Sequence, residues 1–336
     1  MELAVGVIGT GNIGADHARR LATRVAGARV HAVFDLDGDR AAAIAAEVGA
    51  VALRSAEEVV DDAAVDAVLI ASPGDTHAAL ALACIAAAKP VLCEKPLATT
   101  TEECWKVVEA EAAHGSRLVQ VGFMRRYDAG YLVVKQEIDG GRIGEVLLAH
   151  CIHRNQSVPP SFTSDMSLTD SVIHEIDTAR WLLTEELVAA TVVPVRRSPL
   201  AAEGLLDPQL VLLEAASGAV VEVEVFVNCQ YGYDVRCEVV GSTGTASLEI
   251  PTANVVTTAG ARSQPVPVDW RLRFGAAYLE ELQHFVDAVR AGGVAGPSSY
   301  DGYAATAVAE SCVRSLKEGQ RAQVTLAKRP ALYETA

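Results

Sequence analysis

The sequence predicts an α/β protein with two domains, a doubly wound parallel sheet followed by an α/β domain with an open, largely antiparallel sheet. Three observations support this fold class. Strands alternate with helices in the first third, strand follows strand after about residue 145, and a chain of 336 residues suits roughly two domains. We expect the domains to span residues 1–123 and 124–336.

Composition argues against several kinds of partner. The formal net charge is −15, whereas nucleic-acid binding relies on clustered Lys and Arg. No segment approaches the ~18 consecutive apolar residues of a membrane span, and the glycine-broken apolar start lacks the basic leader of a signal peptide. The seven cysteines are odd in number and form no CxxC pair, which suits reduced, mostly buried thiols. We therefore expect a soluble cytoplasmic protein without nucleic-acid or membrane partners.

A glycine-rich turn follows the first predicted strand, residues 3–8, and precedes a helix-like segment. It reads Gly9-Thr10-Gly11-Asn12-Ile13-Gly14. In a dinucleotide-binding turn, Gly9 permits the tight bend, Gly11 lets a pyrophosphate approach the backbone, and Gly14 lets helix and strand pack closely. The free N–H groups at the helix start would then face the phosphates. Any tight strand-to-helix connection can use glycines, so the assignment to a Rossmann domain depends on the second strand of the chain.

That second predicted strand, residues 28–35, supports the assignment. It ends in Asp35, which lies 21 residues beyond Gly14, where an acidic side chain accepts hydrogen bonds from the adenosine ribose. Its carboxylate would repel a 2′-phosphate, and Leu36 and Asp37 supply no adjacent positive charge. We therefore expect NAD, rather than NADP, as the cofactor of a Rossmann domain. The alternative is that Asp35 is an ordinary loop acid.

Two later strands of this domain, over 66–73 and 90–96, end at prolines, which remove ladder donors. Their last residues are Ser72-Pro73 and Glu94-Lys95-Pro96. Ligands bind at the carboxyl ends of strands in doubly wound sheets, so we expect both segments at the cofactor edge. His77, at the start of the next helix, is either a cofactor contact or a structural residue.

The second domain consists mainly of strand-like segments. They span 146–153, 188–195, 210–215, 219–228 and 236–250. Within the fourth, valines alternate with Glu222 and Glu224, so one face packs while the acidic face is solvated or meets a partner. His150 and His153 would point to opposite faces of their strand, and the sequence contains no HExxH pattern. These patterns indicate no metal site.

One helix, over 170–181, interrupts these strands. A 3.6-residue period places Asp170, His174 and Asp177 in one stripe, with Val172, Ile176, Ala179 and Leu183 on the other side. A histidine with carboxylates one turn away on each side can be held in one tautomer, as a general base for alcohol oxidation requires. The alternative is a polar stripe that faces solvent.

Together these segments resemble the glucose-fructose oxidoreductase, inositol dehydrogenase and MocA (Gfo/Idh/MocA) family over nearly the whole chain. The motifs are GTGNIG near the start, CEKPL after the fifth strand and DSVIHEIDTARWL in the second domain. Three further segments are similar to the inositol 2-dehydrogenases within it: GFMRRYD, HRNQSVP and YGYDVRCEVVG, at 122–128, 153–159 and 231–241. The resemblance implies an open second sheet that pairs subunits into dimers or tetramers.

The resemblance also implies a catalytic set. The lysine of the EKP motif, Lys95, would reach the substrate hydroxyl beside the nicotinamide, together with Asp170 and His174, and the Lys95–Pro96 bond would be cis. The positions that match the polyol pocket are Arg125, His153, Asn155, Asp170, His174 and Tyr233.

The implied reaction moves a hydride from a ring carbon of a cyclic polyol to NAD, with myo-inositol and its 2-keto product as the expected pair. His174 would take the hydroxyl proton, Lys95 would hydrogen-bond the developing alkoxide, and Asp170 would tune both. Two alternatives remain open. One is an NAD-dependent dehydrogenase of another inositol, an aldose or an anhydrosugar. The other is a non-catalytic NAD-binding sensor, which would be expected to lack one of the three residues.

Overall fold

The computed structural model describes residues 2–248 and 255–334 and divides into two compact units. The first comprises Met1–Met124, Tyr278–Thr306 and Leu326–Ala336, and the second comprises Arg125–Ala277 and Ala307–Thr325. The predicted domains, 1–123 and 124–336, placed every C-terminal residue in the second. The structure groups part of the C-terminal region with the first unit because Leu282, Phe285 and Val286 pack in the same apolar core as the first strand.

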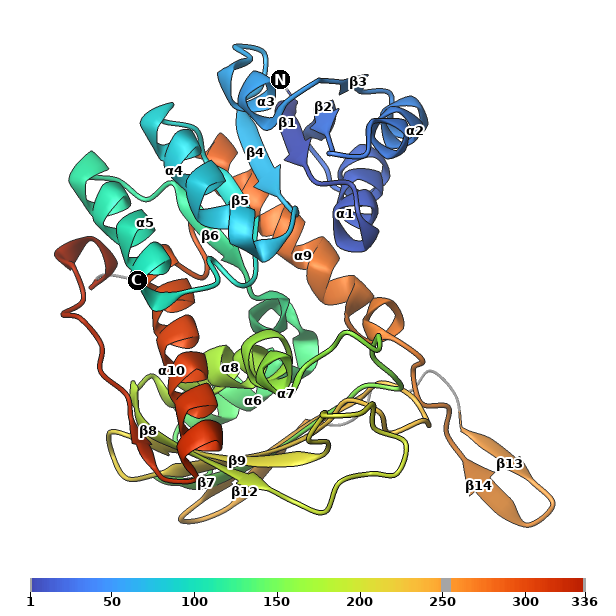
Figure 1. The fold of residues 1–336 in the computed structure, drawn as a ribbon, viewed down its shortest axis with the longest axis vertical. Helices are drawn as coiled ribbons and strands as arrows, with labels where there is room; N and C mark the ends of the chain where they lie inside the picture. Colours follow the sequence, from blue (N-terminus) through green and yellow to red (C-terminus); the bar gives the residue numbers. More distant parts are fainter. Residues whose placement is uncertain (1, 249–254, 335–336) are drawn as a thin grey trace. The chain divides into compact units, whose positions relative to one another are not determined.

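The sheet of the first unit has six parallel strands in the order β3-β2-β1-β4-β5-β6 (Figure 1). They are β1 (Leu3–Ile8), β2 (Ala28–Phe34), β3 (Val51–Ala52), β4 (Ala67–Ile70), β5 (Val91–Glu94) and β6 (Val119–Gly122). This confirms the predicted doubly wound sheet, whose strand order reverses between β1 and β4. Sequence reasoning missed β3, because two exposed residues carry no periodic pattern.

The helices of the Rossmann sheet begin at recognisable caps. They are α1 (Asn12–Thr23), α2 (Gly38–Val48), α3 (Ala56–Asp61), α4 (His77–Ala86) and α5 (Thr101–His114). The side chains of Asp37, Ser55 and Thr100 cap α2, α3 and α5 by accepting backbone N–H bonds. Helix α1 differs, since its N-cap is Gly11 and no side chain caps it. The first backbone N–H groups of α1 are therefore not covered by a cap.

The sheet of the second unit has seven strands in the order β12-β11-β7-β10-β9-β8-β15. They are β7 (Val146–Arg154), β8 (Leu187–Pro194), β9 (Gln209–Ala215), β10 (Val220–Phe226), β11 (Asp234–Gly241), β12 (Thr245–Ser247) and β15 (Ala322–Gln323). All neighbours are antiparallel except β7 and β10, which confirms the largely antiparallel sheet. The last two residues of the strand predicted over 236–250 lie outside the described residues.

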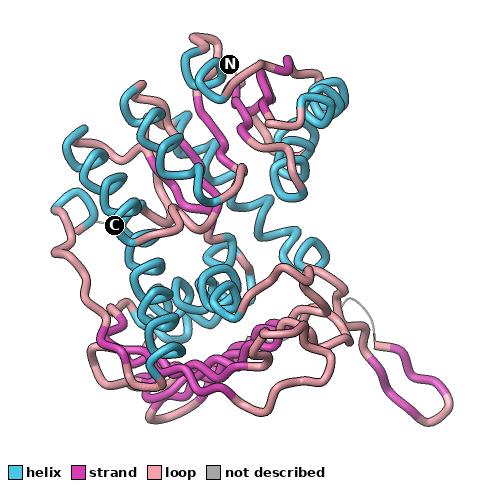
Figure 2. Tube along the Cα trace, in the orientation of Figure 1, coloured by secondary structure: helices cyan, strands magenta, loops and turns pink. Residues whose placement is uncertain are grey.

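Helical segments cover one face of this sheet, and a separate hairpin projects from it (Figures 1 and 2). The hairpin strands are β13 (Val256–Thr258) and β14 (Ala261–Ser263). The remaining helices are α6 (Ala129–Asp139), α7 (Ser164–Met166), α8 (Ile173–Leu183), α9 (Trp270–Arg290) and α10 (Ser299–Glu318). In the part of the chain that the structure describes, no helix combines the length and apolar character that crossing a membrane would require.

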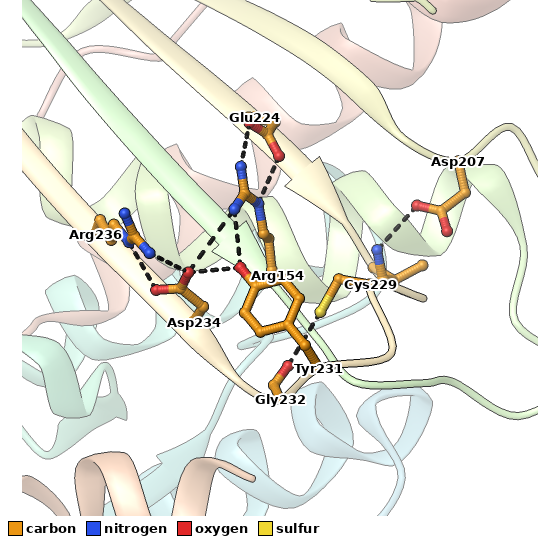
Figure 3. A network of polar contacts seen from close by, with 9 residues as sticks. Arg154, Asp207, Glu224, Cys229, Tyr231, Gly232, Asp234 and Arg236 are labelled. Carbon is orange, nitrogen blue, oxygen red and sulfur yellow. Dashed lines mark hydrogen bonds and ion pairs between the residues drawn. The ribbon is translucent and has the colours of Figure 1, made fainter. Parts of the chain in front are cut away.

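The other face of the sheet carries ion pairs. In β10 the buried side chains are Val221, Val223 and Val225, while Glu222 contacts His150 at 2.5 Å and Glu224 pairs with Arg154 at 2.7 Å. Figure 3 shows Arg154 also reaching the hydroxyl of Tyr231 and the carboxylate of Asp234. The predicted alternation of β10 is therefore confirmed, and its acids contact His150 and Arg154 of the neighbouring strand β7.

Candidate active site

The glycine-rich turn has the geometry that its sequence predicts. Gly9 has φ +91°, and a Cβ there would lie 2.5 Å from the backbone of Ala71. A Cβ on Gly14 would lie 2.0 Å from the carbonyl oxygen of Gly9, so only glycine lets α1 pack this closely against the turn. A Cβ on Gly11 would meet nothing within 4 Å. That open space lies beside the uncapped start of α1, where Asn12 and Ile13 form the first turn.

Asp35, at the end of β2, is held by several donors. One carboxylate oxygen accepts from the backbone N–H of Thr10 at 2.7 Å and from its hydroxyl at 3.0 Å. The other accepts from the backbone N–H of Asp37 at 2.9 Å. Arg40 adds a bidentate ion pair, with its closest contact at 2.6 Å. Leu36 and Asp37 supply no positive charge, as expected, but α2 carries the guanidinium of Arg40 onto Asp35, which the sequence did not predict.

These contacts set the charge of Asp35. Burial alone would raise the pKa of its carboxyl group, but hydrogen bonds from Arg40, Asp37 and Thr10 lower the pKa to about 2. The carboxylate is therefore ionised throughout the neutral range. Sequence reasoning missed Thr10 and Arg40 as its partners, although Arg40 lies three residues after the N-cap Asp37, a spacing that returns a side chain to the helix start.

The ends of β4 and β5 are tied together by His77. This residue is buried, and its Nε2 lies 2.8 Å from the carbonyl oxygen of Ser72 while its Nδ1 lies 2.7 Å from that of Pro96. The hydroxyl of Ser72 also hydrogen-bonds Thr76 at 2.6 Å, and Pro73 between them is exposed. The structure thus brings the two predicted edge segments together and supports the structural alternative for His77.

Glu94 is buried beside α1. Its Oε1 lies 2.7 Å from Nε2 of His17, and its Oε2 accepts the backbone N–H of Lys95 at 3.2 Å. The Lys95–Pro96 bond is cis, as expected. Sequence reasoning missed His17, whose only signal is a polar side chain on the buried face of α1. The glutamate of the EKP motif therefore fixes the turn from which Lys95 emerges.

The predicted polar helix is buried and begins in a wider turn. Residues Ser167–Val172 form a π-helical turn, α8 follows, and every residue from Ile173 to Arg180 is buried. The solvent-facing alternative is therefore wrong. Asp170 lies in the wide turn, so the 3.6-residue spacing that related it to His174 does not hold there. Asp177 forms a bidentate ion pair with Arg126, at 2.6 and 3.0 Å.

A second buried ion pair lies one residue from His174. Glu175 pairs with Arg125, and Nδ1 of His153 lies 3.0 Å from both oxygens of Glu175. The ring of His153 is 6.3 Å from that of His174 and 5.9 Å, edge-on, from that of Tyr233. The structure thus gathers four of the predicted pocket positions. Sequence reasoning missed Glu175, because it considered only one stripe of the helix.

Asn155 follows β7 directly. Its backbone N–H donates to the carbonyl oxygen of Phe226 at 3.0 Å, and its own carbonyl oxygen accepts from the N–H of Cys229 at 3.0 Å. Its side-chain Oδ1 is buried and has no hydrogen-bond partner among the described residues. Leaving a buried acceptor without a hydrogen bond costs free energy. A hydroxyl group bound beside Asn155 would supply the missing donor.

No metal centre is formed by the residues at 2–248 and 255–334, since no group of three or more His, Cys, Asp and Glu side chains is arranged to hold an ion. All seven cysteines are free thiols, and six of them are buried, as expected. Burial raises the pKa of the Cys84 thiol to about 12.

Comparison with known families decides the classification. Residues 3–123 match the family described as "Oxidoreductase family, NAD-binding Rossmann fold", and residues 135–326 match its "C-terminal alpha/beta domain". The chain belongs to the Gfo/Idh/MocA oxidoreductase family. Its N-terminal unit is therefore an NAD-binding Rossmann domain, as the glycine turn and Asp35 predict.

Several members of the Gfo/Idh/MocA family are similar along their entire length. "Inositol 2-dehydrogenase 3" of Saccharopolyspora erythraea is 53% identical over 99% of this chain and 98% of its own. "Inositol 2-dehydrogenase" of Burkholderia cenocepacia is 51% identical over 99% of each chain. The crystal structure of myo-inositol dehydrogenase from Lactobacillus casei with NAD(H) and myo-inositol superposes with a TM-score of 0.96, at 36% identity, over 99% of this chain and 100% of that one.

A family member with a different inositol bound is more distant. Scyllo-inositol dehydrogenase from Lactobacillus casei, solved with NAD(H) and scyllo-inositol, has a TM-score of 0.89 at 25% identity and covers 96% of this chain and 99% of its own. The two Lactobacillus casei structures therefore share the fold with this chain, but the one with myo-inositol is closer in both backbone and sequence.

Proposed function

We propose that this protein is an NAD-dependent dehydrogenase that oxidises a ring hydroxyl of a cyclic polyol, with myo-inositol as substrate and its 2-keto derivative as product. The observation that carries this proposal is the full-length similarity, above 50% identity, to proteins named inositol 2-dehydrogenase. The structural similarity to an enzyme solved with NAD(H) and myo-inositol supports the same substrate. The scyllo-inositol relative is the specific reason to keep other inositol isomers as the second candidate.

The cofactor part of the proposal rests on the Rossmann unit. The open space at Gly11 and the uncapped start of α1 fit a pyrophosphate, and the ionised Asp35 fits a ribose diol. In the proposal the residues that contact NAD or shape its site are Gly9, Gly11, Asn12, Ile13, Gly14, Asp35, Ser72, Pro73, His77, Glu94 and Lys95. When bound, NAD supplies the hydride acceptor. The buried contacts of His77 and Glu94 give these two residues the task of shaping the strand ends around it.

The catalytic part assigns three roles. His174 accepts the proton of the substrate hydroxyl, Lys95 stabilises the negative charge that develops on that oxygen, and Asp170 orients and tunes both groups. The burial of His174 supports its role, because the exclusion of water strengthens interactions with a developing charge. The sensor alternative is disfavoured because Lys95, Asp170 and His174 are all present.

The substrate part assigns the polyol to residues of the second unit. His153, Asn155 and Tyr233 offer a ring nitrogen, an unpartnered amide oxygen and a phenol. Burial raises the pKa of Tyr233, which keeps the phenol protonated as a donor. Arg125 completes the proposed set. Groups of this kind suit a ligand whose surface is a ring of hydroxyls.

We also propose a cytoplasmic homotetramer, assembled through the sheet of the second unit. The free buried thiols support a reducing compartment. The outer face of the sheet supports assembly, because it combines partly exposed apolar side chains with ion pairs such as Arg154–Glu224. Light scattering after gel filtration measures the mass, and a monomer would refute the assembly.

The experiment that tests the function is NADH absorbance at fixed protein concentration with NAD and, in turn, myo-inositol, scyllo-inositol, chiro-inositol, glucose and xylose. NADP replaces NAD in a parallel series. We expect turnover with myo-inositol and NAD. Turnover with a sugar or another inositol alone would keep the catalytic assignment and overturn the substrate. Absence of turnover with every compound, despite measurable NADH binding, would favour the sensor.

A further inference from the structure

A buried trio of Arg125, Glu175 and His153 lies next to the proposed base in the second unit. The three side chains are 1%, 2% and 3% exposed. They come from the turn at Met124–Tyr127, from α8 and from β7 respectively. Their meeting point is therefore set by tertiary packing, and the ring of His153 lies 6.3 Å from that of His174.

The charges of the trio determine where the protons sit. Burial alone would raise the pKa of Glu175, but the charge of Arg125 and the hydrogen bonds from His153 and Arg125 lower it below its ordinary value. Glu175 is thus an ionised carboxylate, which can only accept hydrogen bonds. Because both of its oxygens lie 3.0 Å from Nδ1 of His153, the proton of that nitrogen belongs between them.

The contact of Arg125 with the same nitrogen does not reverse this assignment. One guanidinium nitrogen lies 3.1 Å from Nδ1 of His153, and arginine can only donate. A lone pair on Nδ1 would accept a hydrogen bond from Arg125 but would be repelled by the two carboxylate oxygens of Glu175. A proton on Nδ1 can instead be donated to both of these oxygens. Arg125 already donates to Glu175 and lies over the ring of Phe274. With that proton on Nδ1, the neutral form of the His153 ring carries its lone pair on Nε2.

We propose that Glu175 is a positioning residue for the substrate: it holds His153 as the Nδ1–H tautomer, so that Nε2 accepts a hydrogen bond from a polyol hydroxyl. This inference rests on the proposed function and deepens it. Arg125 acts through Glu175 by keeping its carboxylate ionised and oriented.

Asn155 extends the same acceptor surface. It lies two residues beyond His153 and continues the extended backbone, since its N–H bonds to β10. Residues two apart on a strand share a face, and Oδ1 of Asn155 is a buried acceptor without a partner among the described residues. Two acceptors side by side match neighbouring hydroxyls, which a cyclic polyol presents as donors.

The first test is spectroscopic and needs no substrate. In cofactor-free protein with ¹⁵N-labelled histidine, we expect His153 to show the Nδ1–H tautomer, with its signals identified by their loss in His153→Gln. In Glu175→Gln, the proportion of the Nε2–H tautomer should rise. The matched control is Glu186→Gln, which removes a carboxylate bound to Arg180 of the same helix at 2.7 Å and should leave the signals unchanged. A wild-type Nε2–H tautomer would overturn the proposal.

The second test is kinetic. Glu175→Gln should raise KM for myo-inositol about tenfold or more, the usual effect of weakening a hydrogen bond in a charged network, while KM for NAD stays unchanged. His153→Gln should do the same, and the double variant should be no worse than His153→Gln alone, because Glu175 acts through His153. If the increases in KM of the two single variants added up in the double variant, Glu175 and His153 would act independently, which would contradict this.

A second variant tests the proposal if Glu175→Gln does not fold. If Glu175→Gln fails to fold with Arg125 left unpaired, Arg125→Met with Glu175→Gln removes the buried charge as well, and the tautomer of His153 is measured there. A wild-type protein that oxidises no polyol would refute the proposed function while the tautomer result still stands. Normal turnover of myo-inositol with unchanged KM and tautomer in Glu175→Gln would refute the positioning role alone.

Discussion

The glycine turn after β1 and the buried helix α8 both carry proposed site residues, but they do so by different physics. In the turn, the role of each residue follows from local backbone geometry: Gly9 adopts φ +91°, and Gly14 leaves no room for a Cβ. In α8, the role of each polar residue depends on a partner far away in the sequence. Glu175 meets Arg125, 50 residues earlier, and Asp177 meets Arg126, 51 residues earlier. Local motifs therefore reveal the first kind of site but not the second.

The largest expected effect is the loss of catalysis in Lys95→Ala. Removing the ammonium that stabilises the developing alkoxide should lower kcat about 10²–10⁴-fold, whereas NADH binding, followed by fluorescence titration, should persist. Lys106→Ala is the control, since that lysine forms an exposed pair with Glu102 and should turn over normally. A Lys95→Ala enzyme with wild-type kcat would remove the catalytic proposal.

The next effect compares a buried ion pair of the second unit with an exposed ion pair of the first unit. Asp177→Asn leaves Arg126, which is 15% exposed, without its carboxylate, and should lower the free energy of unfolding by about 3 kcal/mol or more. Glu47→Gln breaks a bidentate pair with Arg19 whose side chains are about half exposed and should change stability far less. Urea denaturation measures both. Equal effects would mean that the buried pairs of α8 do not differ energetically from surface pairs.

Sequence reasoning predicted most of the first unit because its signals are local. The parallel, doubly wound sheet, the glycine turn and the position of Asp35 all follow from strand and turn patterns, whereas the two-residue β3 is too short to form one. It failed at Arg40, where a helix turn returns a side chain to the strand end.

In the second unit, sequence reasoning predicted the sheet but not the burial of its helix. Periodicity assigned one polar stripe to α8, while the structure buries Glu175 and Arg180 on other sides as well. Each of these charges is tolerated inside because an opposite charge pairs with it. Arg180 pairs with the nearby Glu186, but Glu175 pairs with Arg125, 50 residues earlier, and a single sequence contains no local signal for that pairing. The wide turn before Ile173 is likewise set by packing.

The glycine turn offers a smaller but cleaner contrast. Gly14→Ala places a Cβ 2.0 Å from a backbone oxygen and should lower the free energy of unfolding by about 2–4 kcal/mol. Gly11→Ala meets no protein atom, so its thermal midpoint should stay near wild type while KM for NAD rises. Calorimetry and NADH titration measure the two. A Gly11→Ala protein with unchanged affinity for NAD would show that the pyrophosphate does not approach there.

The smallest effect concerns Asp35 and depends on pH. Its folded-state pKa of about 2 lies below its ordinary value of 3.8, so its ion pair adds stability above about pH 4 and loses that contribution as pH falls toward 2. The difference in unfolding free energy between wild type and Asp35→Asn should therefore be constant near neutrality and shrink in this acidic window. KM for NAD at pH 7 should rise in Asp35→Asn, because an amide accepts the ribose hydroxyls less strongly than a carboxylate.

Asp37→Asn is the matched control for that measurement. Asp37 is the N-cap of α2 and its side chain is half exposed, and asparagine caps a helix about as well as aspartate. We therefore expect little change in stability or in KM for NAD. If Asp37→Asn altered KM for NAD as much as Asp35→Asn does, the affinity for NAD would depend on the total negative charge of this loop and not on one carboxylate. A selective effect of Asp35→Asn would instead assign the ribose to one carboxylate, whose orientation Thr10 and Arg40 determine.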